Sequence, residues 1–189
     1  MTTPLTTRVS AAAIQRNTGI KRYALEALQQ AGIIKQEPDH GDLLLLKQWM
    51  QKEYVTGKDN IRDHDRVGLA VPLTDPGLSP DLELTEGNGA ADARQSIQER
   101  GVVLTKGQFL TGWWRVRIDM AERLVAERSP IVGVTGGLVT SGAWIDAIAL
   151  VHPLSMRKAF IVTRMTDAEI EGYRGSVPNI NQGGTYFRN

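Results

Sequence analysis

The spacing of apolar residues predicts three short helices in the first part of the chain. Ser10 precedes an alanine-rich stretch and is a suitable N-cap for the first helix. Apolar residues then recur at helical spacing over residues 20–31 and again over residues 42–54. Gly32 suits the end of the second helix, because glycine readily adopts a left-handed backbone there. We therefore expect residues 1–57 to form a small helical region.

The first two of these helices are joined by a tight turn at Thr18-Gly19. Two helices connected in this way resemble a helix-turn-helix, whose second helix enters the major groove of DNA. Lys21 and Arg22 then stand at the start of the second helix, where side chains reach DNA most easily. Any small helical bundle has the same pattern, so both interpretations stay open.

Residues 58–100 are interrupted densely by glycine, proline and aspartate, which is typical of linkers and loops. Within this segment, residues 67–73 are suited to one strand and residues 90–99 to one helix. We expect the rest of the segment to be irregular.

From Gly101 onward, helical and strand patterns alternate, which predicts an α/β (α+β) domain over residues 101–174. Gly136-Gly137 favours a hairpin turn. The polar, glycine-rich residues 175–189 predict a flexible tail. The expected elements are a strand over 102–104, a helix over 118–127, strands over 130–134 and 138–140, a helix capped by Ser141 over 141–150, a strand over 159–163 and a last helix capped by Thr166.

Composition removes several kinds of chemistry. The chain has no cysteine, which excludes disulfides, thiolate metal sites and cysteine nucleophiles. The net charge is only +1, so any binding of nucleic acid must depend on a local basic patch. No apolar run approaches the roughly 20 residues that span a bilayer, and the N-terminal residues do not resemble a secretory signal. We therefore expect a cytoplasmic protein.

The order of elements after Gly101 resembles the core of the ParB/sulfiredoxin superfamily, over residues 101–172. That resemblance implies a ParB/sulfiredoxin-like α/β domain, here preceded by the small helical region. The segments that carry it are Ala126 to Val134, Gly136-Gly137, Thr140-Ser141-Gly142, Ala147-Ile148-Ala149, Ala159 to Arg164 and Thr166 to Glu169.

The resemblance places a phosphate-binding helix start at Ser141 and Gly142. Free backbone N–H groups and the helix dipole favour an anion there, and glycine lets a phosphate approach closely. Ser141 as a simple helix cap is an alternative. The superfamily usually carries an arginine, and often an acidic residue, soon after this glycine, and both are absent here. The phosphates of ATP therefore need other cations. The candidates are Arg115 and Arg117, and Arg157 or Lys158 after His152.

Three further residues are candidates for catalysis. Asp146 and Glu122 offer the carboxylate oxygens that Mg²⁺ prefers. His152 is a candidate general base, because a free histidine side chain titrates close to neutral pH. Solvated surface charges, or a histidine at a helix end, explain the same residues without catalysis.

Trp114 beside the two arginines is suited to stacking a base and holding a phosphate. Arg157 and Lys158 add a second basic pair near His152. The alternative is that the tryptophan lies in the core while the arginines face solvent.

The segments around Trp144 to Ala147, His152-Pro153 and Ala159-Phe160 are similar to the plasmid fertility inhibition factors. That resemblance implies ATP hydrolysis and Mg²⁺-dependent cleavage of single- or double-stranded DNA, used to block conjugative DNA transfer through a type IV secretion system. The absence of cysteine excludes sulfiredoxin chemistry.

Two alternatives to the enzyme stay open. One is a non-enzymatic DNA-binding regulator of the transcriptional or partition type, with a ligand-sensing second domain. The absence of the superfamily's arginine after Gly142 favours this alternative. The other is an interaction module that binds components of the secretion machinery.

Overall fold

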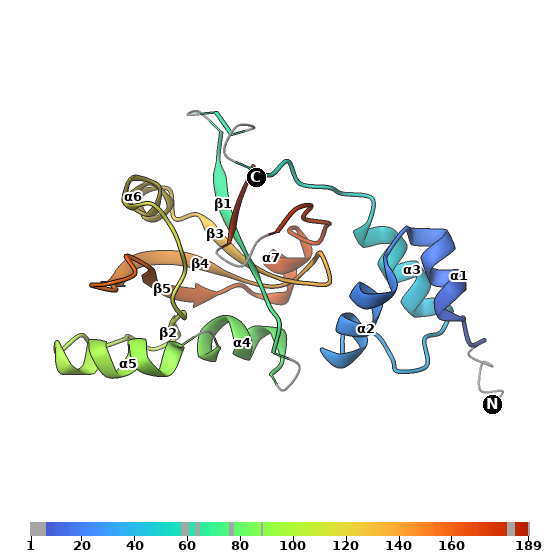
Figure 1. Ribbon diagram of the computed structural model, residues 1–189, viewed down its shortest axis with the longest axis horizontal. Coiled ribbons are helices and arrows are strands. Elements are labelled where there is room, and N and C mark those ends of the chain that lie inside the picture. The colour runs from blue at the N-terminus through green and yellow to red at the C-terminus, as the bar shows by residue number, and fades with distance from the viewer. Residues whose placement is uncertain are drawn as a thin grey trace.

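A computed structural model describes residues 7–57, 61–62, 65–75, 78–87, 89–180 and 184–188 (Figure 1). Its helices are α1 (Ala11–Thr18), α2 (Arg22–Gln30), α3 (His40–Trp49), α4 (Pro80–Glu86), α5 (Ala90–Glu99), α6 (Ile118–Ala126) and α7 (Asp167–Glu171). Its strands are β1 (Val67–Pro72), β2 (Gln108–Leu110), β3 (Pro130–Thr135), β4 (Leu138–Val151), β5 (Lys158–Arg164) and β6 (Thr185–Arg188). None of the helices in the described ranges has the length and apolar character needed to cross a membrane.

The six strands form one mixed sheet in the order β2-β5-β4-β3-β1-β6. β1 and β3 are parallel, whereas every other neighbouring pair is antiparallel. Helices pack against this sheet, and three more helices lie beside it (Figure 1). The predicted α/β (α+β) class is therefore confirmed.

Alternating residues of the strands face two separate cores, as the pleat of a sheet requires. Leu69 of β1 and Ile131 of β3 face a core that includes Leu124 of α6. Their neighbours Ala70 and Val132 face the opposite side. That second core is completed by Tyr54, Val134, Val139, Ile170, Val177 and Phe187.

The three N-terminal helices have a core of their own beside the sheet. Ser10 caps α1 through a hydrogen bond from the backbone N–H of Ala13, and Asp39 and Asp42 form a capping box at α3. Leu138, the first residue of β4, also packs into this helical core. Its other buried members are Ile14, Ile20, Ala24, Leu25, Leu28, Ile34, Leu43, Leu46 and Trp49.

Most of the expected elements are present. The three N-terminal helices, the helix over 90–99, the Gly136-Gly137 hairpin and the helix capped by Thr166 are confirmed. The third helix ends at Trp49, earlier than the predicted residue 54. The strands predicted over 67–73, 130–134 and 159–163 correspond to β1, β3 and β5, and the helix predicted over 118–127 corresponds to α6.

The predicted helix over residues 141–150 is wrong, because β4 continues through them to Val151. This segment pairs with β3 on one side and β5 on the other, so backbone pairing outweighs the helical preference of its alanines. Ala143 and Ile145 are fully buried, whereas Trp144 and Asp146, which follow them in turn, are partly exposed. This alternation is that of a strand.

Two further predictions are corrected. Residues 102–104 form no strand, and the edge strand β2 lies at Gln108–Leu110 instead. α4 falls in a stretch expected to be irregular. It is only seven residues long and begins at Pro80, whose fixed backbone suits a first helical turn.

The described part of the predicted flexible tail is packed against the sheet. β6 pairs with β1, and Val177 and Phe187 are buried. Residues 181–183 and 189 lie outside the described residues. Because β1 and β6 belong to the sheet, the α/β domain extends beyond residues 101–174 on both sides.

Glu83 connects α4 to the end of β1. Its carboxylate accepts hydrogen bonds from the backbone N–H groups of Thr74 and Asp75, and it is 9% exposed. Burial raises the pKa of Glu83 above its usual 4.5, because the charged carboxylate loses solvation.

Replacing Phe187 by alanine should lower the free energy of unfolding by about 3–5 kcal/mol, because a buried ring is lost and a cavity is left. The ring lies over Gly68, where an added Cβ would come within 2.2 Å of it. Urea unfolding measures the change. Leu154→Ala is the control, since Leu154 is 90% exposed, and it should change stability by less than about 0.5 kcal/mol. A loss below about 1 kcal/mol for Phe187→Ala would contradict the packed position of β6.

Glu83→Gln should alter how stability depends on pH. In the wild-type protein the folded state holds the Glu83 proton more tightly than the unfolded state, so this contribution to stability is lost as pH rises from 4.5 through the raised pKa. Glutamine has no such proton. The variant should therefore gain stability relative to wild type as pH increases from 4 to 8, measured by urea unfolding at each pH. A difference that stays constant over this range would show that the pKa of Glu83 is not raised.

Candidate nucleic-acid interface and adjacent cleft

The turn between α1 and α2 spans three residues and is held by local hydrogen bonds. Gly19 adopts a left-handed backbone with φ of 75°, and its N–H donates to the carbonyl of Gln15. The Thr18 hydroxyl donates to the carbonyl of Ile14 and accepts from the N–H of Ile20. Ile20 is buried in the helical core, which fixes the direction in which α2 leaves the turn. Two helices joined by a tight turn in this way are found in a helix-turn-helix and also in other small helical bundles.

The start of α2 presents polar side chains to solvent. Lys21 is the N-cap residue, Arg22 is the first residue of the helix, and Tyr23 is 67% exposed. Arg22 forms an ion pair with Glu26 one turn later, at 2.9 Å. Lys21 has no ion-pair or hydrogen-bond partner among the described residues. A free ammonium and an aromatic hydroxyl therefore stand at the end of α2 that enters a groove in helix-turn-helix proteins.

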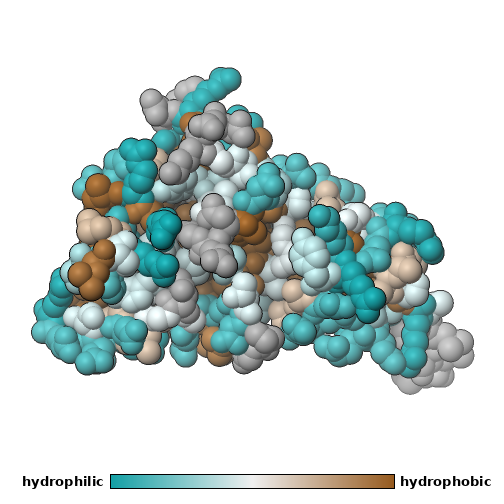
Figure 2. Space-filling view, in the orientation of Figure 1, coloured by the Kyte–Doolittle hydropathy of each residue, from teal (hydrophilic) through white to brown (hydrophobic). Residues whose placement is uncertain are grey.

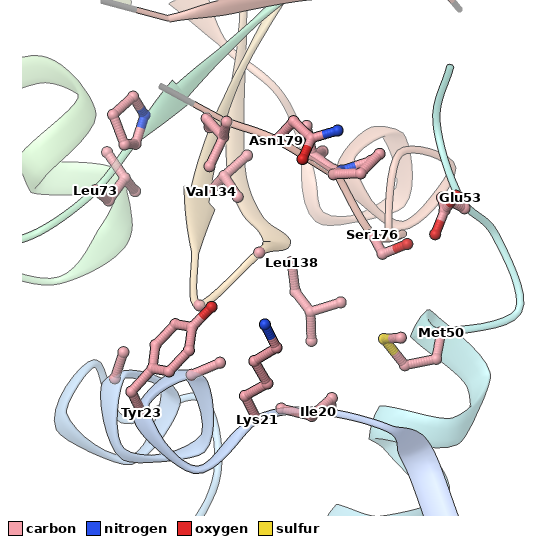
Figure 3. A pocket seen from close by; sticks show the side chains of 18 of the residues that line it. Ile20, Lys21, Tyr23, Met50, Glu53, Leu73, Val134, Leu138, Ser176 and Asn179 are labelled. Carbon is pink, nitrogen blue, oxygen red and sulfur yellow. The ribbon is translucent and has the colours of Figure 1, made fainter. Parts of the chain in front are cut away.

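A cleft of about 800 Å³ lies beside this helix start (Figure 3). It separates α2 and the end of α3 from the β3–β4 hairpin and the segment 176–180. Figure 3 shows the Lys21 amine and the Tyr23 hydroxyl both pointing from α2 toward the hairpin. Glu53 and Ser176 lie together on another wall, and Asn179 lies near Val134.

The two residues of the predicted phosphate cradle lie inside the sheet. Ser141 is 1% exposed, and its hydroxyl donates to the carbonyl of Pro80. A Cβ added at Gly142 would come within 2.6 Å of Ile170. Since neither residue stands at a helix start, the free N–H groups expected to bind phosphate are not present there.

Asp146 is held in a network of side chains on the sheet. Its carboxylate accepts hydrogen bonds from the Thr163 hydroxyl at 2.6 Å, from Arg128 at 3.3 Å and from Gln108 at 3.4 Å. Glu122 is exposed on α6. Within the described ranges, no group of three or more acidic or histidine side chains converges on a metal site. Binding of ATP and Mg²⁺ stays a prediction from resemblance.

The candidate residues before α6 differ in burial: the two arginines are exposed, and the tryptophan is buried. Arg115 and Arg117 are exposed, and Arg117 forms an ion pair with Asp119. Trp114, which precedes both arginines, is 3% exposed and belongs to the core of the sheet. It cannot stack on a base without leaving that core.

The two basic residues after His152 also differ in exposure. Lys158 is 3% exposed, and its ammonium donates to the carbonyl of Met156 at 2.7 Å. Arg157 is partly exposed. His152 Nδ1 accepts hydrogen bonds from the backbone N–H groups of Leu154 and Ser155, so it closes the turn between β4 and β5.

Comparison with known proteins adds no assignment: no protein-family model, curated protein or solved structure matches the chain. The resemblance to the ParB/sulfiredoxin superfamily and to fertility inhibition factors therefore stays a prediction.

Three cleft residues were not among the candidates from sequence. Glu53 follows the third helix, and Ser176 and Asn179 belong to the segment expected to be a flexible tail. The available signal in the sequence was Val177, an apolar residue within a polar run. In the structure Val177 is buried, and the segment packs against the protein.

Asp146→Ala should lower the free energy of unfolding by about 1–3 kcal/mol, because the hydroxyl of Thr163 loses its acceptor. Glu122→Ala removes the other candidate carboxylate from an exposed position, and it should change stability by less than about 0.5 kcal/mol. Thermal and urea unfolding of both variants compare them directly. Equal stability of the two variants would show that the network around Asp146 does not stabilise the fold.

Proposed function

We propose that this protein is a DNA-binding regulator that reads DNA with α2. The observation that carries the proposal is the pair of short helices α1 and α2, joined by a three-residue turn and supported by a core of their own. In helix-turn-helix proteins, residues at the start of the second helix contact base edges, while the first helix crosses the backbone.

The distribution of charge in the helical region supports the proposal that the start of α2 faces DNA. Arg8 and Lys35 are paired with Glu37 and Asp39. Arg16 at the end of α1 and Lys21 at the start of α2 have no ion-pair partner among the described residues. These two cations flank the turn between the two helices, beside Arg22, which is paired with Glu26, so they form a local basic surface on a chain of net charge +1.

The regulator has more support than the ATP-dependent nuclease. Ser141 and Gly142 lie in β4 and not at a helix start, and Asp146 is bonded to Thr163, Arg128 and Gln108. The start of α2, in contrast, is exposed and free to bind. Transfer inhibition and secretion-system partners rest on resemblance alone.

The purified full chain should bind duplex DNA, with an affinity that falls as salt increases because phosphate contacts release counterions. Lys21→Ala and Arg22→Ala should each reduce the slope of log affinity against log salt by about one. Fluorescence anisotropy with a labelled duplex, titrated at several salt concentrations, measures this slope.

Lys106→Ala is the matched control, because it removes one exposed cation in the turn before β2. It should leave the slope unchanged. Absence of binding at low salt, or an equal effect of Lys106→Ala, would contradict the proposal. DNA cleavage with Mg²⁺ that is lost in Asp146→Ala would instead favour the nuclease.

A further inference from the structure

The cleft beside α2 has the size and the walls of a small-molecule site. Its volume of about 800 Å³ lies within the range of about 300–1,000 Å³ that is typical of ligand pockets. Figure 2 shows a group of apolar side chains near the middle of this face, with polar surface on both sides. The apolar residues of the cleft include Ile20, Ala27, Met50, Leu73, Leu138 and Val177.

Two polar groups in this cleft lack partners. The Ser176 hydroxyl is buried, in a residue only 9% exposed, and has no hydrogen-bond partner among the described residues. A buried hydroxyl without a partner is costly, but this oxygen has almost no accessible surface, so a ligand pairs with it only when the side chain turns toward the cleft. The Lys21 ammonium is also unpaired and points into the cleft (Figure 3). It marks the place for an anionic group.

Glu53, the one acidic residue among the described residues that line the cleft, does not cancel this charge. Glu53 lies beside Ser176, on a different wall from Lys21, and no ion pair joins Glu53 to Lys21 (Figure 3). A ligand with its acidic group at Lys21 has its apolar body against the apolar residues that line the cleft. Glu53 lies on the other wall, where a hydrogen-bond donor of the ligand is suited.

From this arrangement we infer that the cleft binds a small amphipathic organic acid, and that this ligand lowers the affinity of α2 for DNA. The second part rests on the proposed function. Lys21 and Tyr23 both line the cleft and stand at the start of α2. A ligand acid that pairs with Lys21 removes that cation from the DNA phosphates. By thermodynamic linkage, DNA lowers the affinity for the ligand by the same factor.

Two fluorescent probes test the ligand site on the full chain. 1-Anilinonaphthalene-8-sulfonate carries an apolar body and an anion, and N-phenyl-1-naphthylamine has the same body without the charge. The sulfonate should bind at one saturable site. Lys21→Gln should weaken its binding by about five- to tenfold, as expected for a partly solvated charge-assisted contact, and leave the uncharged probe unchanged.

The control variants separate the cleft from the rest of the surface. Lys47→Gln, on the exposed face of α3, should bind both probes like wild type. Ala27→Leu, and the larger Ala27→Trp, should weaken both probes by filling the cleft, with circular dichroism confirming that each variant is folded. Sulfonate binding that is indifferent to Lys21→Gln, or to both Ala27 variants, would overturn the site.

The coupling is tested by titrating labelled duplex DNA with and without saturating sulfonate probe. Wild-type protein should lose affinity for DNA, whereas Lys21→Gln should show a smaller loss. Unchanged DNA affinity in wild type would overturn the coupling. If the protein binds no DNA at all, the proposed function and the coupling both fail, while the probe titrations still decide the ligand site.

Discussion

The contact between the β3–β4 hairpin and α2 determines how the two parts of the molecule lie. Gly136 at the hairpin turn lies so close to α2 that an added Cβ would come within 2.6 Å of the carbonyl of Ala24. Leu138, two residues after Gly136, is buried in the helical core. A side chain at Gly136 would push the hairpin away from the helix, which would remove Leu138 from that core. The cleft exists because the remaining surfaces of the two parts do not meet.

Elements specified by local chemistry could be predicted from the sequence. The Ser10 and Thr166 caps and the Gly136-Gly137 turn depend on residues close together in the chain, and all three are present. Segments whose state depends on distant partners could not be predicted in this way. Residues 141–150 contain alanines and a serine that suit a helix, but residues 141–144 pair with β3 and residues 143–150 pair with β5.

The same distinction explains the candidate sites. Lys21 and Arg22 were predicted correctly to stand at the start of a helix after a tight turn, because that geometry is local. Ser176 and Asn179 reach the cleft only because the chain returns beside the sheet after α7. The surroundings of Asp146 depend equally on distant residues, since Gln108 and Thr163 come from the two strands β2 and β5.

The position of the cleft has a consequence for selectivity. The wall formed by Glu53 and Ser176 comes from segments outside α1 and α2, whereas Lys21 belongs to the turn that we propose reads DNA. A ligand that touches only the apolar walls leaves Lys21 free, so it has no differential effect on phosphate binding. A ligand with an acidic group competes with DNA for one ammonium. If α2 reads DNA and the cleft binds a ligand, as proposed, the charge of the ligand, more than its size, determines whether occupation of the cleft changes the affinity for DNA.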